Sequence, residues 1–303
     1  MYLASRCDEL SEKTLAQHRL VLDRLRRFYE QQGVLFVREL NADSLETFRT
    51  HGLPAQLQST SRATAMAKVH CFLRTAFRRS WIAEPLVDKL TRGKAVYQQK
   101  DPFTEEETTL ILDEALKLTG GTHAYAKHPI TFRLLLELMI ETGMRVGDAI
   151  RYDPAKVTRG EYLWVYNYVH QKSRRTEQPK SIEAYLDDRL KTAIDKCHWL
   201  SASRPFAFGE FRNPNYLASE VYYRMQTIGQ RTGVTDCRPH RLRDTFAVRL
   251  LLSGIPLEDV ARLLGHSSVK VTETYYAKWI AARKKRLERL LAERRPAEAL
   301  VNS

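Results

Sequence analysis

Three short segments of the chain hold arginine, histidine or tyrosine where a purely structural helix would not need them. In the first, TGMRVGD (residues 142–148), Arg145 follows a strongly apolar stretch and lies between two glycines. Glycine lets a backbone approach a ligand closely, and a guanidinium binds an anion through two parallel hydrogen bonds. The segment suits an anion clamp, although taken alone it fits a surface arginine at a turn better.

The second segment places a histidine and an arginine near the start of a predicted helix. His240 and Arg243 are three residues apart, so they share one helix face. That face would present two hydrogen-bond donors and the positive end of the helix dipole to a phosphate. An HxxR pair is common by chance, so this segment is weak evidence when it stands alone.

The third segment, Gly265-His266, is followed about ten residues later by Tyr275 and Tyr276. A core histidine and an aromatic patch would also explain it. Together the three segments offer Arg, His, Arg, His and Tyr in that order. The set lacks the paired carboxylates of a metal nuclease or polymerase, and it lacks a glycine-rich loop for nucleotide hydrolysis. We therefore expect no metal and no other cofactor.

These segments together resemble the tyrosine recombinase family, also called phage-type integrases. The resemblance is carried by TGMRVGD (142–148), by HRLRDTFAVRLLLSGIPLEDVARLLGHSS (240–268) and by the tyrosines that follow. It extends over essentially the whole chain, because the N-terminal part is similar to the core-binding domain of that family. It implies a site-specific recombinase that cleaves and rejoins DNA through a 3′-phosphotyrosyl intermediate, without metal or ATP.

The resemblance also implies roles for individual residues. Arg145 matches the first catalytic arginine, His240 and Arg243 match the HxxR pair, and His266 matches the second histidine. Lys172, in the turn after an aromatic strand, best fits the lysine of the family's β-hairpin.

Two neighbouring tyrosines compete for the role of nucleophile. Many relatives place it nine residues after the second histidine, which gives Tyr275, whereas the Tyr-Ala-x-Trp context matches relatives that place it ten residues after, which gives Tyr276. We favour Tyr276. Asp148 and Asp244 occupy positions that often hold carboxylates in the family, and we expect them to orient Arg145 and to cap a helix, respectively.

The elements that must position these residues are mostly helices. In the first hundred residues, apolar side chains from Leu15 to Phe28 recur near helical spacing, a capping box at Asp43 and Glu46 predicts a second helix, and a third is expected from Ser59 through Phe77. The third carries arginines that we expect to contact DNA, although a solvated helix face explains any one of them: Arg74, Arg78 and Arg79.

A polar segment near residue 100 divides the chain into a helical core-binding domain, 1–98, and a catalytic domain, 99–303. The second domain opens with a capping box at Thr104 and Glu107. It is expected to be mostly helical, with strands at 162–169 and 181–185 joined by a polar turn. The fold class is thus mainly α with a small β-hairpin.

Composition agrees with a polyanionic partner. The 303 residues carry 49 Lys plus Arg against 36 Asp plus Glu, a net charge of +13, and residues 1–100 and 101–303 are both basic. We expect the partner to be double-stranded DNA, bound through contacts between basic side chains and its phosphates. Three further arginines are predicted to take part: Arg174, Arg175 and Arg241.

The sequence also leads to expectations about cellular location and assembly. No apolar stretch is long enough to span a bilayer, and residues 1–10 do not form a signal peptide, so we expect no membrane association. The four scattered cysteines fit a reducing cytoplasm, and a nucleoid-associated location of the prokaryotic type. The family resemblance suggests a tetramer on DNA, with the basic segment 277–299 docking on a neighbouring protomer. Accessory DNA-bending proteins or a sister recombinase are further expected partners.

Two rival functions remain at this stage. One is a type IB topoisomerase-like enzyme, with the same chemistry but relaxation of DNA in place of strand exchange. The other is a catalytically inactive DNA-binding protein with an architectural or regulatory role. The apparently complete set of catalytic residue types argues against the second rival.

Overall fold

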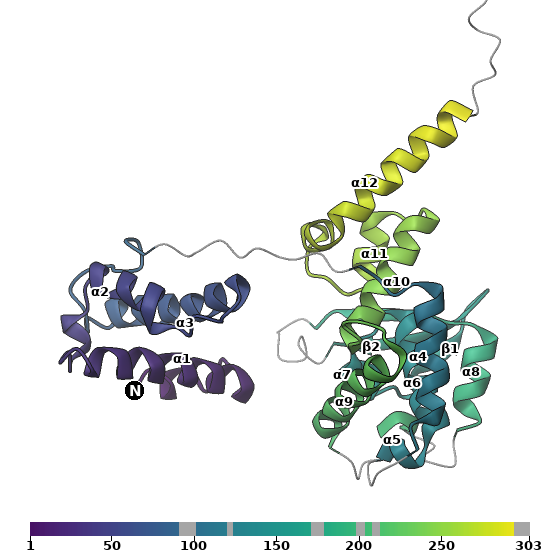
Figure 1. Cartoon of the computed structure of the whole chain (residues 1–303), viewed down its shortest axis with the longest axis horizontal. Coiled ribbons are helices and arrows are strands. Elements are labelled where there is room, and N and C mark those ends of the chain that lie inside the picture. The colour runs from purple at the N-terminus through teal and green to yellow at the C-terminus, as the bar shows by residue number, and fades with distance from the viewer. Residues whose placement is uncertain (91–100, 120–123, 171–178, 198–203, 208–212, 294–303) are drawn as a thin grey trace, which may run out of the picture. The chain divides into compact units, whose positions relative to one another are not determined.

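The computed structural model describes residues 1–90, 101–119, 124–170, 179–197, 204–207 and 213–293. The chain forms two compact units, Met1–Gln98 and Gln99–Ser303 (Figure 1). The boundary between them lies inside the polar segment at residues 91–102. Each unit has its own apolar core, so each is described by itself.

The first unit is a helical bundle. Its helices are α1 (Glu12–Glu30), α2 (Ala42–Thr47), a π-helical turn (Phe48–Gly52) and α3 (Ser59–Arg78). Apolar side chains at helical spacing face inward, and Leu45, Phe48 and Leu73 are fully buried among them. The helices predicted around Leu15–Phe28 and from Ser59 are confirmed.

The predicted capping box at Asp43 and Glu46 is wrong. The helix begins two residues earlier, after Asn41, whose side-chain oxygen accepts a hydrogen bond from the Ser44 backbone N–H at 2.9 Å. The Ser44 hydroxyl in turn accepts from the Asn41 N–H. Asn41 has the extended backbone that an N-cap requires, whereas Asp43 already lies inside the helix and Glu46 pairs with Arg49.

The second unit is mostly helical, as predicted, around a small three-stranded antiparallel sheet of which β2 and β3 were predicted. Its elements are α4 (Glu105–Lys117), α5 (Ala124–Lys127), α6 (Pro129–Thr142), α7 (Val146–Ala149), β1 (Val157–Arg159), β2 (Trp164–Val169), β3 (Ser181–Leu186), α8 (Asp188–Asp195), α9 (Pro214–Thr232), α10 (Pro239–Ser253), α11 (Leu257–Leu263) and α12 (Val269–Glu293). The strand order is β1-β2-β3, and Tyr166 of β2 lies opposite Val157 and Ala184. The predicted capping box is present, since Thr104 and Glu107 exchange hydrogen bonds of 3.0 and 3.1 Å.

Helix α6 lies at the centre of the second unit. Its side chains are apolar almost all round, and it packs against α4, α8, α10 and β3. A helix of that composition is stable only when it is covered on several sides. It ends at Gly143, whose left-handed backbone (φ 64°) turns the chain directly into the segment that holds Arg145. The packing of α6 in the core therefore fixes the position of the segment that holds Arg145.

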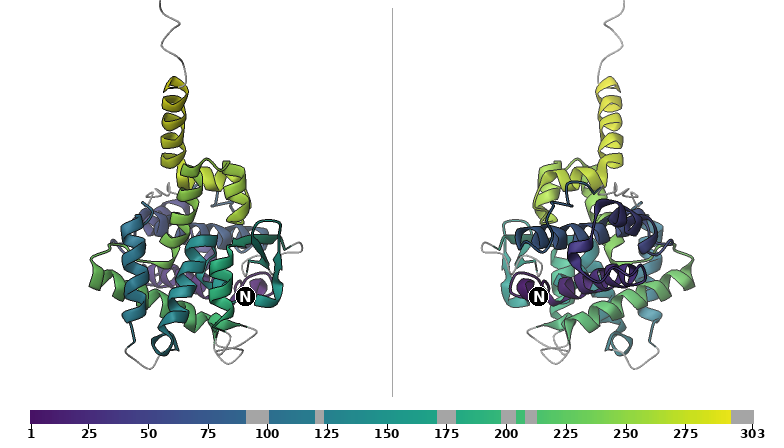
Figure 2. Two further views of the ribbon diagram at one scale, coloured as in Figure 1. Left: turned by 90° about the vertical axis from the view of Figure 1, so that its right-hand side faces the viewer. Right: turned by 90° about the vertical axis from the view of Figure 1, so that its left-hand side faces the viewer.

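Helix α12 is interrupted at Tyr276, which has non-helical dihedral angles (φ −118°, ψ 18°). Its first part packs against α10 and α11, and its second part extends away from them (Figure 1 and Figure 2). Among the residues that the structure describes, no helix is long and apolar enough to cross a membrane.

Candidate active site

The turn after α6 directs Arg145 toward the end of β2. Arg145 is the N-cap residue of α7, and its Nη1 lies 2.5 Å from Nε2 of His170, which directly follows β2. The other ring nitrogen of His170, Nδ1, lies 2.8 Å from a carboxylate oxygen of Asp148. Arg145, His170 and Asp148 therefore form one connected group of side chains.

A second arginine enters the same region from the first turn of α10. Arg243 is only 1% exposed, and its guanidinium donates hydrogen bonds to the carbonyl oxygens of Gly143 (2.7 Å) and Leu264 (2.5 Å). Burial lowers its pKa to about 10, and the charge of Arg145 contributes in the same direction. Two like charges held this close favour the binding of an anion.

Two histidines flank these arginines, and both have a lowered pKa. Partial desolvation lowers the pKa of His240, the charges of Arg243 and Arg145 add to this, and Asp244 opposes it. Burial lowers the pKa of His266 to about 4, with further contributions from both arginines. Both rings are therefore neutral at pH 7, the form in which a histidine can accept a proton.

His266 is oriented by a buried threonine. Its Nδ1 lies 2.7 Å from Oγ1 of Thr272, which is inaccessible to solvent on the first part of α12. This bond leaves Nε2 as the ring nitrogen available to a ligand. Sequence reasoning missed Thr272, because a threonine six residues after a histidine is not a distinctive pattern.

The two candidate tyrosines have different surroundings. Tyr276 is 6% exposed, and its hydroxyl donates a hydrogen bond of 2.9 Å to Asp244, whereas Tyr275 is 48% exposed. Burial and then Asp244 raise the pKa of Tyr276, and Arg243 and Arg145 oppose that shift. Tyr276 is thus close enough to both arginines for their charges to act on its hydroxyl.

A cavity of about 790 Å³ opens beside these groups. Arg145, His170, Gly265 and His266 line it, and Lys180, just before β3, adds a further positive charge. A phosphodiester entering the cavity would meet the Arg145 guanidinium and the ring of His266. The arrangement suits the binding of a phosphate and the stabilisation of added negative charge on it.

A sequence profile of the phage integrase family matches residues 103–280, which is more than half of the chain. The chain belongs to the phage integrase family. Members of this family are tyrosine recombinases, and the chain is therefore a tyrosine-type DNA recombinase by family.

Individual relatives of this integrase are recombinases of bacteria. The tyrosine recombinase XerD of Agrobacterium fabrum is 26% identical over 280 residues, covering 86% of this chain and 83% of the relative. XerD of Bifidobacterium longum is 27% identical over 224 residues, covering 71% and 70% of the two chains.

Solved integrase structures share the fold. The XerH site-specific recombinase in its post-cleavage complex with palindromic difH matches with a TM-score of 0.69 at 15% identity, over 92% of this chain and 79% of that one. A lambda integrase dimer bound to a COC′ core site matches with a TM-score of 0.63 at 18% identity, over 90% and 91%.

The integrase structure brings together five of the six residues predicted to be catalytic: Arg145, His240, Arg243, His266 and Tyr276. The sixth, Lys172, lies outside the described residues, as do Arg174 and Arg175. Three arginines that were predicted to contact DNA are exposed in the first unit, Arg74 and Arg78 on α3 and Arg79 at its C-cap.

Arg241 is engaged inside the protein. It is buried, and its guanidinium donates to the carbonyls of Asp101, Pro102 and Thr235 and pairs with Glu107. With its donors used in this way it has no free face for a DNA phosphate. Arg241 lies about 100° around α10 from its neighbour His240, so it is buried while His240 is exposed.

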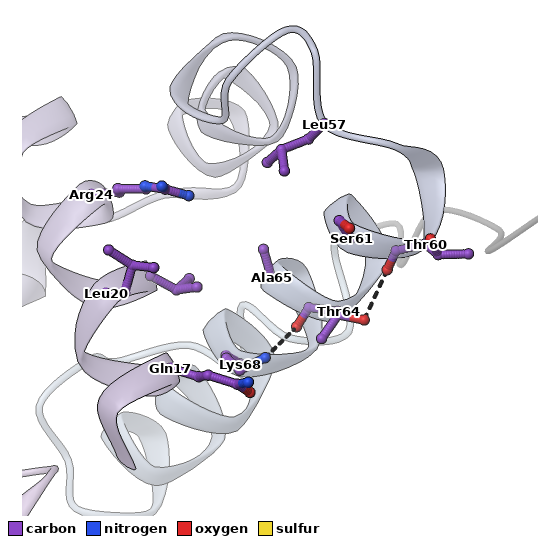
Figure 3. Close-up of a pocket in the computed structure, with 10 residues that line it drawn as sticks. Gln17, Leu20, Arg24, Leu57, Thr60, Ser61, Thr64, Ala65 and Lys68 are labelled. Atoms are coloured by element: carbon purple, nitrogen blue, oxygen red, sulfur yellow. Dashed lines mark hydrogen bonds between the residues drawn. The ribbon is translucent and has the colours of Figure 1, made fainter. Parts of the chain in front are cut away.

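The first unit has a separate groove between α1 and α3, lined by both apolar and polar side chains. Figure 3 shows Gln17 and Arg24 projecting from α1, and Thr64 and Lys68 from α3, around a space of about 390 Å³. The Lys68 ammonium lies 3.4 Å from the Thr64 carbonyl, and partial burial lowers its pKa. By helical spacing, Thr64 and Lys68 lie on the same side of α3 as Arg78, so a basic strip extends along that helix.

Proposed function

We propose that this protein is a site-specific DNA recombinase that cleaves and rejoins strands through a covalent 3′-phosphotyrosyl bond on Tyr276. The observation that carries this proposal is that Tyr276 is buried and its hydroxyl donates to Asp244, the residue that follows Arg243 on α10. Family membership supports recombination as the overall reaction. The tyrosine identifies where the strand would be held.

The chemistry follows from the charges of the site. The Tyr276 oxygen forms a bond to phosphorus and the bond from phosphorus to the 5′ oxygen breaks. Arg145 and Arg243 stabilise the negative charge that builds on the non-bridging oxygens, which needs no metal. The bases available for the phenol proton are the Asp244 carboxylate, which already accepts the hydrogen bond of the Tyr276 hydroxyl, and the neutral rings of His240 and His266.

Lys172 would protonate the departing 5′ oxygen as general acid. The phosphotyrosyl bond keeps the energy of the original phosphodiester, so rejoining consumes no ATP. Attack by a 5′ hydroxyl from another strand reverses the first step and completes strand exchange.

Double-stranded DNA is the proposed partner. XerH and lambda integrase were both solved in complexes with DNA sites, and this chain shares their fold. In the first unit the groove between α1 and α3, together with Arg74 and Arg78, would meet the duplex (Figure 3). A DNA-bound tetramer would assemble through the second part of α12, and a cytoplasmic, nucleoid-associated location fits this substrate.

Covalent trapping tests the proposal. Duplexes from the DNA flanking the gene are labelled and nicked, so that a short 5′-hydroxyl fragment escapes after cleavage. Wild type and Tyr275→Phe should form an adduct that survives denaturation, whereas Tyr276→Phe should form none while binding the same DNA.

Each other outcome points elsewhere. An adduct lost only in Tyr275→Phe would move the nucleophile to that residue. Relaxation of any supercoiled plasmid without need of a particular site would favour a topoisomerase. No adduct on any duplex that the protein binds would sink the proposed chemistry.

A further inference from the structure

The geometry points to His170 as a positioning residue for the proposed phosphate chemistry. We infer that its neutral imidazole accepts a hydrogen bond from Arg145 and so fixes that guanidinium at the wall of the cavity. The inference rests on the proposed function, because it assigns Arg145 to the scissile phosphate. His170 itself would act through the arginine.

The contacts of His170 define its tautomer. An arginine has only donors, so the 2.5 Å approach of Arg145 Nη1 requires Nε2 of His170 to be an acceptor without a proton. A protonated Nε2 would set two donors against each other at that distance. The ring proton therefore lies on Nδ1, from which it is donated to the Asp148 carboxylate at 2.8 Å.

The ring is held from several sides. His170 and Asp148 are both buried, and the edge of Tyr168 meets the imidazole with ring centres 5.5 Å apart. Tyr168 stacks in turn on Tyr166 at 5.3 Å, so alternate residues of β2 form a ladder of rings that ends at His170. A ring packed in this way has little freedom to change its rotamer.

Gly265 closes the remaining side. Its backbone is left-handed (φ 61°), and a Cβ at this position would collide with the His170 ring and with Ile182. The absence of a side chain lets the loop after α11 come close to the imidazole. The same loop carries His266, so the ring that positions Arg145 also lies against the segment that holds a proposed proton acceptor.

His170, which contacts Arg145, also lies next to the carbonyl group that binds Arg243. Its Nε2 is 3.1 Å from the Leu264 carbonyl oxygen, and that oxygen accepts the hydrogen bond from Arg243. Because neither the carbonyl nor the unprotonated Nε2 carries a hydrogen, the two guanidiniums supply the protons of this cluster. The Nε2 of His170 and the Leu264 carbonyl are thus neighbouring acceptors, one for Arg145 and one for Arg243.

Loss of such a supporting group has a measurable size. Removing an outer partner that orients a metal ligand typically costs about 10–100-fold in affinity or activity, and we apply the same scale to the partner of Arg145. Misplacement of a reacting group by about 1 Å can cost about 100-fold. We expect a loss of about 10–100-fold in the rate of covalent adduct formation, with little change in DNA affinity.

Nuclear magnetic resonance tests the tautomer without any need for a DNA target. Long-range proton–nitrogen correlation on the full chain, labelled with ¹⁵N-histidine, should give His170 a protonated Nδ1 and an unprotonated Nε2. The signal is assigned by its loss in His170→Gln. A protonated Nε2 in the native protein at pH 7 would overturn the inference outright.

Kinetics test the consequence. His170→Phe keeps a ring of similar size but cannot accept from Arg145, whereas His170→Gln offers an amide oxygen near the Nε2 position. His170→Phe should form adduct about 10–100-fold more slowly than wild type, and His170→Gln should recover part of that loss. His128→Phe, the same substitution at the start of α6 and away from the cavity, is the matched control.

The outcomes separate the two proposals. If wild type forms no adduct on DNA that it binds, the proposed function fails, while the tautomer measurement still decides the state of His170. If wild type reacts and folded His170→Phe reacts within about threefold of it, well under the expected loss, the positioning role is refuted. Equal loss in the Gln and Phe variants, with unchanged melting temperatures, would refute the acceptor role.

Discussion

The surroundings of His266 determine the protonation state of its ring. Burial and the neighbouring arginines lower its pKa to about 4, whereas an unperturbed histidine has a pKa of about 6.5. The folded protein therefore keeps this ring neutral at pH values where the unfolded chain has already protonated it. The ring remains able to accept a proton throughout the neutral range.

A pH series of unfolding measures this effect. Between pH 6.5 and about 4 the unfolded state binds one more proton at His266 than the folded state, so a fall in pH favours unfolding. His266→Asn keeps a polar atom facing Thr272 but does not titrate. The free energy of unfolding of wild type should drop relative to that of the variant from pH 7 downward and level off near pH 4. Parallel curves across this range would contradict the assigned shift.

Residues on local motifs were predictable, and residues that act through packing were not. Arg145, His240, Arg243 and His266 lie in short segments whose spacing is visible in the sequence. His170 has no such pattern, since its role depends on β2 reaching α7 and the loop after α11. Asp148 was expected to orient Arg145, and it lies beside Arg145 through this unforeseen histidine.

At the scale of elements, two glycines with left-handed backbones shape the turns that contact Arg243. Gly143 ends α6 and offers its carbonyl to Arg243, and Gly265 follows Leu264, whose carbonyl binds the same guanidinium. The predicted helices and both hairpin strands agree with the structure because their periodicity is local, whereas most of the predicted turn between the strands lies outside the described residues. The short strand β1 was missed, since three residues give no alternation to detect.

Gly265→Ala tests the tight approach of this loop. The added Cβ must collide with His170 and Ile182, and such overpacking costs about 1–3 kcal/mol beyond the strain of a left-handed alanine. Gly233→Ala is the matched control, because Gly233 is also left-handed (φ 78°) but has nothing within 4 Å of the new Cβ. Chemical denaturation should give a larger loss for Gly265→Ala, together with loss of adduct formation. Equal losses in the two variants would mean that the loop adapts freely.

At the scale of the whole molecule, α12 is divided into two parts with different surroundings. Trp279 packs in the apolar cluster that also contains Tyr276, so the start of the second part belongs to the catalytic unit. Beyond it the helix extends away from α10 and α11 (Figure 2). It carries exposed basic residues, among them Lys284 and Lys285. A surface of this kind suits contact with a second protomer or with DNA.

Truncation after Trp279 tests whether the second part of α12 contributes to DNA binding by one protomer or to assembly of several. We expect one protomer to bind a half-site duplex with nearly unchanged affinity, while complexes of two or more protomers on a full site become weaker. Gel-shift titration measures both, and a chain ending at Glu293 is the control that retains all of α12. Unchanged assembly in the shorter chain would remove α12 from the proposed tetramer contact.

The start of the second unit is tied to α10 in a way that has a mechanical consequence. Arg241 binds the carbonyls of Asp101 and Pro102, its guanidinium lies 4.1 Å from the centre of the Phe103 ring, and the Phe103 N–H donates to Thr245. Tension on the chain at residue 101 is therefore borne by the helix turn that contains His240 and Arg243. In the proposed complex with DNA, a force that reaches residue 101 would therefore be transmitted through Arg241 to the turn of α10 that holds His240 and Arg243.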